Sequence, residues 1–298
     1  MSLVDGWRTT LAASDRDDPT ITLGATDEQP GAPTDAAEAS SRATAIASRL
    51  EIGAALSTSG GAVLYAGRQR PLDRQVAVRR PASEDERRRL AVETRVSARL
   101  EHPGVVPVHL AGPDLLVGKL VNGRSLGERL QEGACDPVEL VTTLIAVADC
   151  LSAAHARGII HRDLKPATVV LGDFGEVYLI DWGLALALDH GPEDLPRPET
   201  TGNLCAGTPA YLAPETARGD AASIGTGVDL FGLGAIVYRA LAGAPPWPQS
   251  NAAAAVAQAA SAGRAPAWDD RVRQRHGALS RLADAWLDPD PARRGGMA

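Results

Sequence analysis

The 298-residue chain is longer than a typical single domain, so one large two-lobed domain with an appendage, or two ordinary domains, are expected. Its hydrophobic content of 44% and charged content of 22% are ordinary for a globular protein, whereas an aromatic content of 4% leaves aliphatic residues and alanine to fill the core. The net charge of -7 argues against a nucleic-acid partner, because phosphate binding requires an excess of basic residues on one face.

The cysteines and the hydropathy pattern favour a cytoplasmic location. Cys135, Cys150 and Cys205 are too widely spaced for a zinc motif and are odd in number, which suits a reducing compartment. The N-terminus lacks the pattern of a signal peptide, and no segment offers about 18 uninterrupted apolar residues. We therefore expect no membrane segment in this chain.

Residues 1–45 are rich in Thr, Asp, Ala, Pro and Gly and show no helical or strand periodicity, which predicts a disordered, acidic tail. Thr20 and Thr22 in DDPTITLG lie beside acidic residues. Two interpretations stay open for them: a solvated linker, which is the simpler one, or a phosphorylation site that a phosphothreonine-binding domain recognises.

Ordered elements are predicted from Leu50 onward. LEIGAALSTSGGAVLYAG and RQVAVRR indicate short strands joined by a turn at STSGG. SEDERRRLAVETRVSARLEHPG predicts a helix that begins with a capping box at Ser83 and Glu86. Its apolar stripe consists of Leu90, Val92, Val96 and Leu100. Two more strands are expected, at 105–110 and 115–121.

The second half of the chain is mostly helical in its pattern. Asp136 as N-cap, Pro137 at the first helical position and Gly158 beyond the end predict a long helix. Strands flank GDFG at 172–175. GVDLFGLGAIVYRALAG indicates a buried helix too short to span a bilayer, and NAAAAVAQAASAG favours a surface helix over a low-complexity loop. The order is a small β-rich lobe with one helix, then a mostly helical lobe.

Four motifs then follow in a fixed order: HRDLKP at 161–166, DWG at 181–183, GTPAYLAPE at 207–215, and Asp229 in GVDLFGLG. Together they resemble the bacterial Hanks-type Ser/Thr protein kinases over about residues 50–294. The resemblance implies an α+β, bilobal fold in one domain, 46–298, with an N-lobe at about 46–121 and a C-lobe at about 122–298. It implies ATP and Mg²⁺ between the lobes and protein substrates, and the family's last C-lobe helix is expected to be missing.

The resemblance assigns three catalytic positions. Asp163 matches the base that takes the proton of the substrate hydroxyl, Lys165 matches the lysine that neutralises the transferring phosphoryl group, and Asp181 matches the magnesium-binding aspartate. Asp163 and Lys165 could instead be a solvated surface pair. However, lysine occurs only at Lys119 and Lys165, and arginine supplies every other basic side chain, so a lysine here favours a phosphate site.

The chain departs from the family pattern on the ATP side. The glycine positions of the phosphate-binding loop correspond to Ser57, Ser59 and Ala62, although Gly60 and Gly61 preserve the turn. Side chains at these positions obstruct the close approach of backbone N–H groups to phosphates, which predicts looser phosphate binding.

Two charged or polar positions also depart. VAVR places Arg79 where the family has a lysine for the α- and β-phosphates, and a bulky planar fork does not replace a point charge. The general drift from lysine to arginine in this chain is the alternative explanation. An ion pair of Arg79 with Glu93 could hold the helix inward without ATP. Thr168 replaces the asparagine that binds a second magnesium, and its shorter hydroxyl is a poorer ligand.

The remaining family positions concern adenine and regulation. Lys119 C=O and Val121 N–H are the expected adenine partners, and Gly118 at the gatekeeper position predicts an open back pocket. Arg162 resembles the arginine that pairs with a phosphorylated activation segment. The candidate phosphorylation sites in that segment are Thr200 and Thr201. Glu215 and Arg294 match the family's structural ion pair, and Asp229 is a further structural position of the C-lobe.

Three functional hypotheses follow. The first is a pseudokinase or severely impaired Ser/Thr kinase that acts as a regulatory or scaffolding module. The second is an active ATP-dependent Ser/Thr kinase with a non-standard clamp, Arg79 for Lys and Thr168 for Asn. The third is a nucleotide-binding switch without transfer. The first is favoured, because three contacts to phosphate and metal are weakened together while the packing motifs persist.

Overall fold

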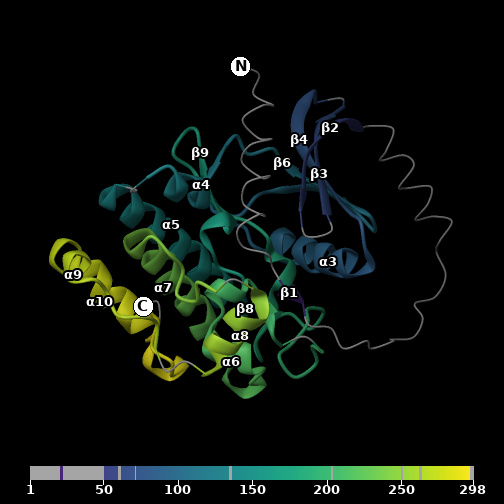
Figure 1. Cartoon of the computed structure of the whole chain (residues 1–298). Helices are drawn as coiled ribbons and strands as arrows, with labels where there is room; N and C mark the ends of the chain where they lie inside the picture. Colours follow the sequence, from purple (N-terminus) through teal and green to yellow (C-terminus); the bar gives the residue numbers. More distant parts are fainter. Residues whose placement is uncertain are drawn as a thin grey trace.

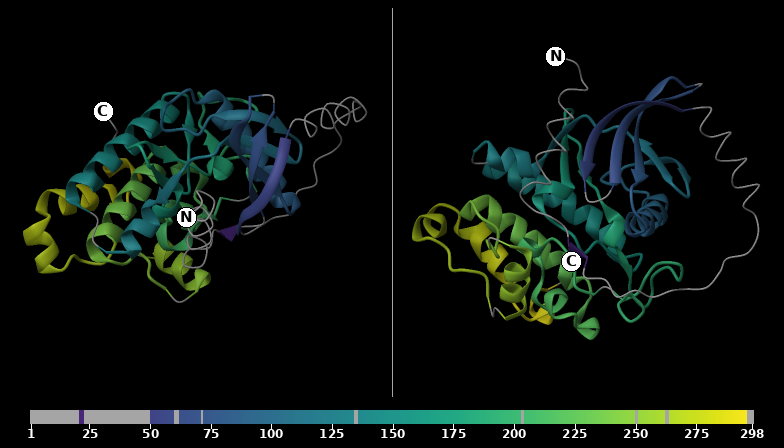
Figure 2. Two further views of the ribbon diagram at one scale, coloured as in Figure 1. Left: turned by 90° about the horizontal axis from the view of Figure 1, so that it is seen from above. Right: turned by 45° about the vertical axis from the view of Figure 1, so that its right-hand side comes forward.

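The computed structural model describes residues 21–22, 50–59, 62–70, 72–133, 136–202, 204–249, 251–261 and 264–295. A small part built on an antiparallel sheet lies beside a larger helical part (Figures 1 and 2), so the predicted bilobal α+β fold is confirmed. The predicted tail, the glycines at 60 and 61 and Cys135 lie outside these ranges, except for residues 21–22.

The N-terminal sheet has five strands in the order β2-β3-β4-β6-β5. Val76, Val78 and Val117 alternate along neighbouring strands and are fully buried on one face, as period-2 patterning requires. The predicted strand at 105–110 begins later, because Pro107 lacks an N–H and only its carbonyl bonds to the sheet, accepting from Lys119 N at 3.1 Å. The strands are β2 (Leu50–Ser59), β3 (Ala62–Gln69), β4 (Arg74–Pro81), β5 (Val108–Gly112) and β6 (Leu115–Lys119).

Helix α3 (Glu84–Arg99) confirms the predicted helix of the small lobe. Ser83 Oγ caps it by accepting from Glu86 N at 3.2 Å. The Glu86 carboxylate does not play the reciprocal part expected of a capping box and instead accepts from Arg79 at 3.0 Å. The predicted apolar stripe of Leu90, Val92, Val96 and Leu100 is buried.

The larger part confirms the predicted helices α5, α7 and α8. Asp136 accepts from Val138 N at 3.1 Å at the start of α5, and α7 is buried along most of its length. Helices α4, α9 and α10 were not predicted. The helices are α4 (Leu126–Gln131), α5 (Pro137–His155), α6 (Pro214–Arg218), α7 (Gly227–Ala242), α8 (Ala252–Ser261), α9 (Asp270–Arg275) and α10 (Gly277–Trp286).

Helix α5 is long and apolar enough to cross a bilayer, the one such helix among the described residues. Core helices of globular proteins pass the same test, and 39% of the most apolar window of α5 is buried inside the molecule. Its Leu144, Val147 and Leu151 belong to the core of the larger lobe.

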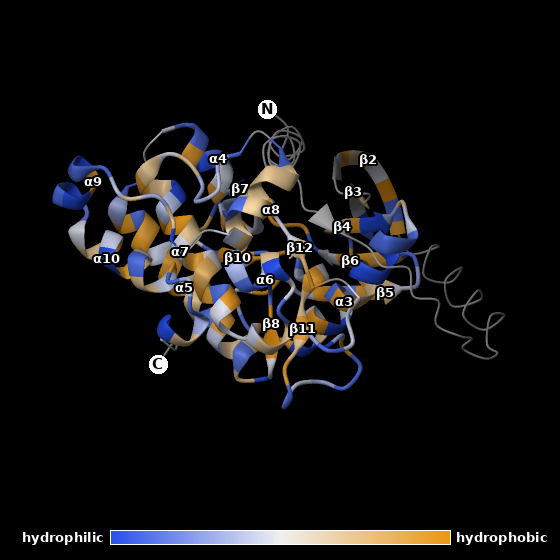
Figure 3. Cartoon of the chain, turned by 60° about the horizontal axis from the view of Figure 1, so that its bottom comes forward, coloured by the Kyte–Doolittle hydropathy of each residue, from blue (hydrophilic) through white to orange (hydrophobic). Residues whose placement is uncertain are grey.

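Short strands between the lobes carry the sequence motifs. The strands β7, β9 and β10 form one small sheet, and β8 pairs with β11 in another. Figure 3 shows both β8 and β11 in the orange of hydrophobic residues. The predicted hairpin around residues 172–175 is therefore confirmed. Their bounds are β7 (Gly123–Ser125), β8 (Ile159–Ile160), β9 (Val169–Gly172), β10 (Val177–Leu179), β11 (Leu186–Ala187) and β12 (Ala206–Gly207).

One element lies where no strand was expected. Strand β1 (Ile21–Thr22), within the segment predicted to be a disordered tail, pairs antiparallel with β12. The sequence of the tail gave no period-2 signal because two residues are too few to show one, and the backbone pairing comes from the partner strand.

A buried ion pair closes the larger lobe. Arg294 donates to both carboxylate oxygens of Glu215, at 2.5 and 2.8 Å, and both side chains are fully buried. The guanidinium also donates to the Gly227 carbonyl at 2.8 Å and lies 5.0 Å from the Phe231 ring. The pair predicted from the sequence thus ties the start of α6 to the end of the chain.

We expect Arg294→Ala to lower the free energy of unfolding by about 3–5 kcal/mol, because it leaves the Glu215 carboxylate buried without its partner. The matched control is Arg293→Ala. That side chain is 71% exposed beside Asp290, so about 0–1 kcal/mol is expected. Urea unfolding of both variants measures the difference. Equal losses in the two variants would show that the buried pair is not stabilising.

Candidate active site

The loop of residues 161–168 is anchored by one buried carboxylate. Asp229 accepts from the amides of His161 and Arg162, both at 2.9 Å, and lies 2.7 Å from His155 Nε2. Burial alone would raise the pKa of Asp229, but the hydrogen bond and charge of His155 outweigh it and hold the pKa below its usual range. Asp229 therefore stays ionised and fixes the start of the loop.

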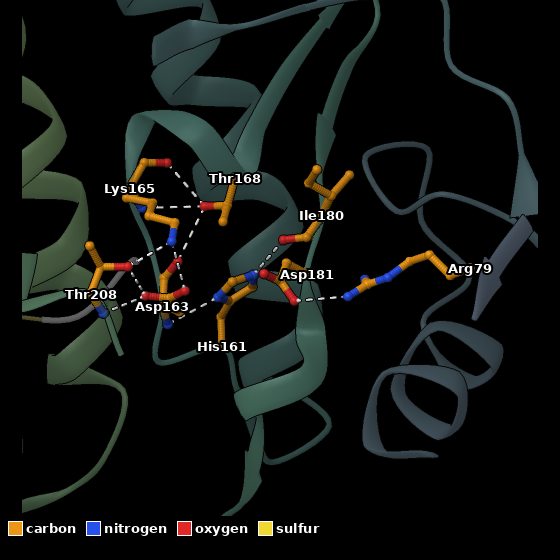
Figure 4. A network of polar contacts seen from close by, with 8 residues as sticks. All are labelled: Arg79, His161, Asp163, Lys165, Thr168, Ile180, Asp181 and Thr208. Atoms are coloured by element: carbon orange, nitrogen blue, oxygen red, sulfur yellow. Dashed lines mark hydrogen bonds and ion pairs between the residues drawn. The ribbon is translucent and has the colours of Figure 1, made fainter. Parts of the chain in front are cut away.

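Asp163 lies in a compact network with Lys165 and Thr208 (Figure 4). Its Oδ1 accepts from Thr208 N at 2.8 Å and from Thr208 Oγ1 at 2.7 Å, and its Oδ2 lies 3.3 Å from Lys165 Nζ. Lys165 Nζ also donates to Thr208 Oγ1 at 2.7 Å. Burial opposes ionisation, but Lys165 and the Thr208 bonds hold the pKa of Asp163 below its usual range. The alternative of a solvated surface pair is excluded, because both side chains are buried.

The Thr168 hydroxyl is turned into the backbone of its own loop. Its Oγ1 lies 3.2 Å from the Asp163 carbonyl, 3.0 Å from the Lys165 carbonyl and 3.2 Å from the Lys165 amide, which donates to it. The side chain is buried. The hydroxyl therefore supports the loop conformation and is engaged before any metal could use it (Figure 4).

Arg79 is surrounded by three carboxylates. Its guanidinium donates to Glu93 at 2.5 Å and to Glu86 at 3.0 Å, and it lies 3.9 Å from Asp181 Oδ1. The predicted pair of Arg79 with Glu93 is present, joining β4 to α3. Burial, with Asp181 and Glu86 nearby, outweighs Arg79 and raises the pKa of Glu93 to about 7.

Asp181 has a left-handed backbone, with φ of 67°, which aspartate tolerates better than most residues. Its side chain is 40% exposed at the junction of the lobes, whereas the next residue, Trp182, is buried. Trp182 Nε1 donates to the Leu179 carbonyl at 3.1 Å, and its ring lies 4.6 Å from the His161 ring. The buried Trp182 thus anchors the backbone next to Asp181, whose carboxylate stays partly exposed.

The donor set fits one magnesium ion better than two. Mg²⁺ prefers carboxylate and carbonyl oxygens, and the exposed Asp181 carboxylate can supply one. Thr168 is engaged by backbone groups. Among the residues with described positions, no group of three or more His, Cys, Asp or Glu side chains is arranged to hold a metal ion.

The strands that flank the expected phosphate-binding loop are paired with each other. Ser59 pairs with Ala62 and Ser57 with Leu64, on either side of residues 60 and 61, which lie outside the described ranges. Ala62 is buried. The turn predicted at STSGG therefore stays a prediction.

A small apolar cluster lies at the segment that connects the lobes. Leu56, Val121, Val170 and Tyr178 are all buried in it, which brings residues of β2, β9 and β10 together at the predicted adenine site. The side chain of Lys119 points to the Tyr178 hydroxyl, at 2.5 Å, so the adenine contact assigned to Lys119 concerns its backbone alone.

The segment before β5 lies close to Gly118, and the expected open back pocket there stays a prediction. A Cβ at Gly118 would lie 3.1 Å from the Pro107 carbonyl oxygen and 3.5 Å from Val106 Cγ1. The segment that leads into β5 therefore approaches Gly118 closely, which explains the glycine.

Arg162 holds the activation segment through backbone groups. It donates to the carbonyls of Leu184, at 3.4 Å, and Leu204, at 2.6 Å, and its own backbone has φ of 71°. Thr200 Oγ1 accepts from Arg197 N at 3.1 Å, and Thr201 N donates to the Arg197 carbonyl. The phosphorylation of Thr200 and Thr201 stays a prediction.

Sequence reasoning missed three contributors to the site. Thr208 lies within the quoted motif GTPAYLAPE, and Glu86 was identified only as a helix cap. His155, which contacts Asp229, lies in the last turn of a predicted helix. The motif was a usable signal for Thr208, whereas Glu86 and His155 needed the packing of distant elements to be recognised.

Comparisons with known proteins agree with this geometry. The family model for the protein kinase domain matches residues 58–298. RqkA of Deinococcus radiodurans, a DNA damage-responsive serine/threonine-protein kinase, is 37% identical over 215 residues, covering 68% of this chain and 31% of that protein. The serine/threonine-protein kinase PknL of Mycobacterium tuberculosis is 34% identical over 215 residues, covering 69% of this chain and 52% of that protein.

A probable serine/threonine-protein kinase, PknB of Corynebacterium glutamicum, is 33% identical over 216 residues, covering 68% of this chain and 32% of that protein. The chain thus spans about a third to a half of the length of these relatives. The extent of the family match and the similarity to these kinases lead to one conclusion: the chain belongs to the protein kinase family, on the branch of bacterial Ser/Thr kinases.

Proposed function

We propose that this chain is a pseudokinase or severely impaired Ser/Thr kinase that acts as a regulatory module through protein partners. The observation that carries the proposal is the position of Arg79 among Glu86, Glu93 and Asp181. Three carboxylates around one guanidinium leave no net positive charge where the family binds the phosphates of ATP.

The electrostatics of this cluster oppose a nucleotide. An anionic phosphate that approaches Arg79 must compete with Glu93 at 2.5 Å and Glu86 at 3.0 Å, which already use the guanidinium fork. A lysine ammonium could be shared between a carboxylate and a phosphate as a point charge, whereas the planar fork of arginine is committed by its geometry. The cluster instead holds α3 against β4 by itself.

The metal side of the site supports the same proposal. When bound, Mg²⁺ would screen the phosphate charge, and Asp181 is the residue that would hold it. The engaged hydroxyl of Thr168 leaves a second ion without its family ligand. Losing one preorganised electrostatic contact costs on the order of a hundredfold in rate, about 3 kcal/mol, although such losses need not add.

An active kinase is the second candidate, and the network at Asp163 favours it. The Asp163 carboxylate is ionised and aligned by Thr208, and Lys165 lies beside it. These residues could orient a substrate hydroxyl and accept its proton. A nucleotide-binding switch without transfer lies between the two candidates. Recognition of the tail threonines by a phosphothreonine-binding domain stays a prediction.

The first test is the transfer of labelled γ-phosphate from Mg-ATP to the protein itself and to a generic basic substrate, with Asp163→Asn as control. We expect incorporation no greater than that of the control, because the nucleotide side of the site is compromised. Incorporation that disappears in Asp163→Asn would instead establish an active kinase with an unusual ATP clamp.

Restoring the family residues should restore nucleotide binding. We expect Arg79→Lys with Thr168→Asn to bind Mg-ATP about tenfold or more tightly than the parent, which corresponds to about 1.4 kcal/mol or more. The matched control is Arg80→Lys, an exposed arginine on the same strand, which should leave the affinity unchanged. Calorimetric titration measures both. No gain in the double variant would contradict our account of the lost contacts.

The raised pKa of Glu93, about 7, predicts a pH-dependent stability. The folded state holds the Glu93 proton more tightly than the unfolded state, so the free energy of unfolding should fall as the pH rises from about 4.5 to 7, by at most about 1.4 kcal/mol per pH unit. Urea unfolding of Glu93→Gln across this range should show a flatter profile. The exposed Glu101→Gln serves as control, and parallel slopes in all three proteins would refute the assignment.

A further inference from the structure

A segment from the start of the chain pairs with the backbone just before Thr208. Strand β1 pairs antiparallel with β12, with Ile21 opposite Gly207 and Thr22 opposite Ala206. Figures 1 and 2 show β1 as a short purple arrow beside the larger lobe, far from the sheet that follows it in sequence. Neither the fold of the lobes nor the proposed function requires this contact.

The contact lies next to the candidate active site. Strand β12 leads directly into Thr208, which donates to Asp163 through its amide and its hydroxyl. A Cβ at Gly207 would lie 3.6 Å from Asp163 Oδ1. Since paired antiparallel strands are roughly 5 Å apart, β1 runs alongside the backbone that borders the Asp163 carboxylate.

The conformation and the close neighbours of Gly207 require a glycine at this end of β12. Its φ is 137°, and a side chain would meet Leu212 Cδ2 at 2.9 Å and the Arg162 carbonyl at 3.2 Å. The strand therefore offers backbone groups without a side chain at this position. An edge strand of this kind is a template for any extended segment that supplies matching N–H and C=O groups.

We propose that β12 is a peptide-docking edge and that the chain's own segment at Ile21–Thr22 is its resident ligand, which covers the protein-substrate position beside Asp163. A partner segment binds there after the resident strand leaves. The proposal concerns strand exchange and needs no phosphate transfer, so it holds for an impaired kinase and for an active one.

The energetics allow the docked segment at Ile21–Thr22 to exchange with a competing strand. Pairing of two residues supplies few hydrogen bonds, each worth about 0.5–1.5 kcal/mol net, which cannot hold a free peptide tightly. The segment is tethered, however, and tethered ligands reach effective concentrations on the order of millimolar. A docked segment in ready exchange with competing strands is the expected result.

The test measures amide hydrogen exchange by NMR on the full chain. In Ile21→Pro with Thr22→Pro, neither residue can donate to β12. Successive amides of a strand point to opposite sides, so either the Ala206 or the Gly207 amide faces β1, and we expect exchange at that amide to become about 5- to 30-fold faster. The amide of Thr208 is the internal standard, because it donates to Asp163 at 2.8 Å and should keep its rate.

The matched control is Ala36→Pro with Ala37→Pro in the same tail, which should leave the rates within about twofold, well below the change expected for the strand variant. A synthetic peptide of residues 16–27, added to the strand variant at millimolar concentration to match the tethered segment, should restore the protection. Unchanged exchange at both Ala206 and Gly207 would overturn the proposal. So would an equal acceleration of exchange at Thr208, an equal acceleration in the control variant, or no rescue by the peptide. No readout uses ATP, so these results are independent of the turnover test.

Discussion

Arg79 joins three elements that could otherwise move independently. It lies on β4, and its guanidinium contacts Glu86 and Glu93 on α3 and approaches Asp181 in the connection between the lobes. The position of α3 therefore depends on a charge cluster made within the chain itself. In a site that binds the phosphates of a nucleotide, the basic side chain at this position would have part of its charge available for the phosphates. Here the guanidinium already contacts carboxylates of the chain itself, so these contacts do not depend on a nucleotide.

The polar groups on the two sides of the site have different partners. On the peptide side, Asp163, Lys165 and Thr208 satisfy one another, and Asp229 fixes the loop through backbone amides. On the nucleotide side, Thr168 has been absorbed into loop support. The contacts on the peptide side thus also hold the loop of residues 161–168 in place. This pattern fits a protein whose surface is used for recognition, with a docking edge beside a well-ordered loop.

Much of the fold was predictable because its signals are local. The capping residues of α3 and α5, the alternating valines of β4 and the buried pattern of α7 each specify an element within a few turns of chain. Helix α4 was missed although SLGE at 125–128 carries a capping box, in which Ser125 and Glu128 bond reciprocally. Strand β1 could not be predicted, because its pairing partner lies almost two hundred residues away in sequence.

The site shows the same division between local and distant information. Motif spacing located Asp163, Lys165 and Asp181, and it gave the pair of Arg79 with Glu93. It did not give the contacts of Glu86 and Asp181 with Arg79, or the direction of the Thr168 hydroxyl. Both depend on how α3 and the loop pack in three dimensions, which no single segment of sequence encodes.

The packing of Trp182 has a consequence for small-molecule ligands. The indole is 1% exposed, lies against the His161 ring and donates its N–H to a carbonyl. Expelling a side chain that buries roughly 200 Å² would cost about 5 kcal/mol at about 25 cal/mol per Å², before the lost hydrogen bond is counted. Compounds that must take the place of this ring would lose several orders of magnitude in affinity. Selective chemical probes for this protein should therefore be sought among molecules that leave the indole seated.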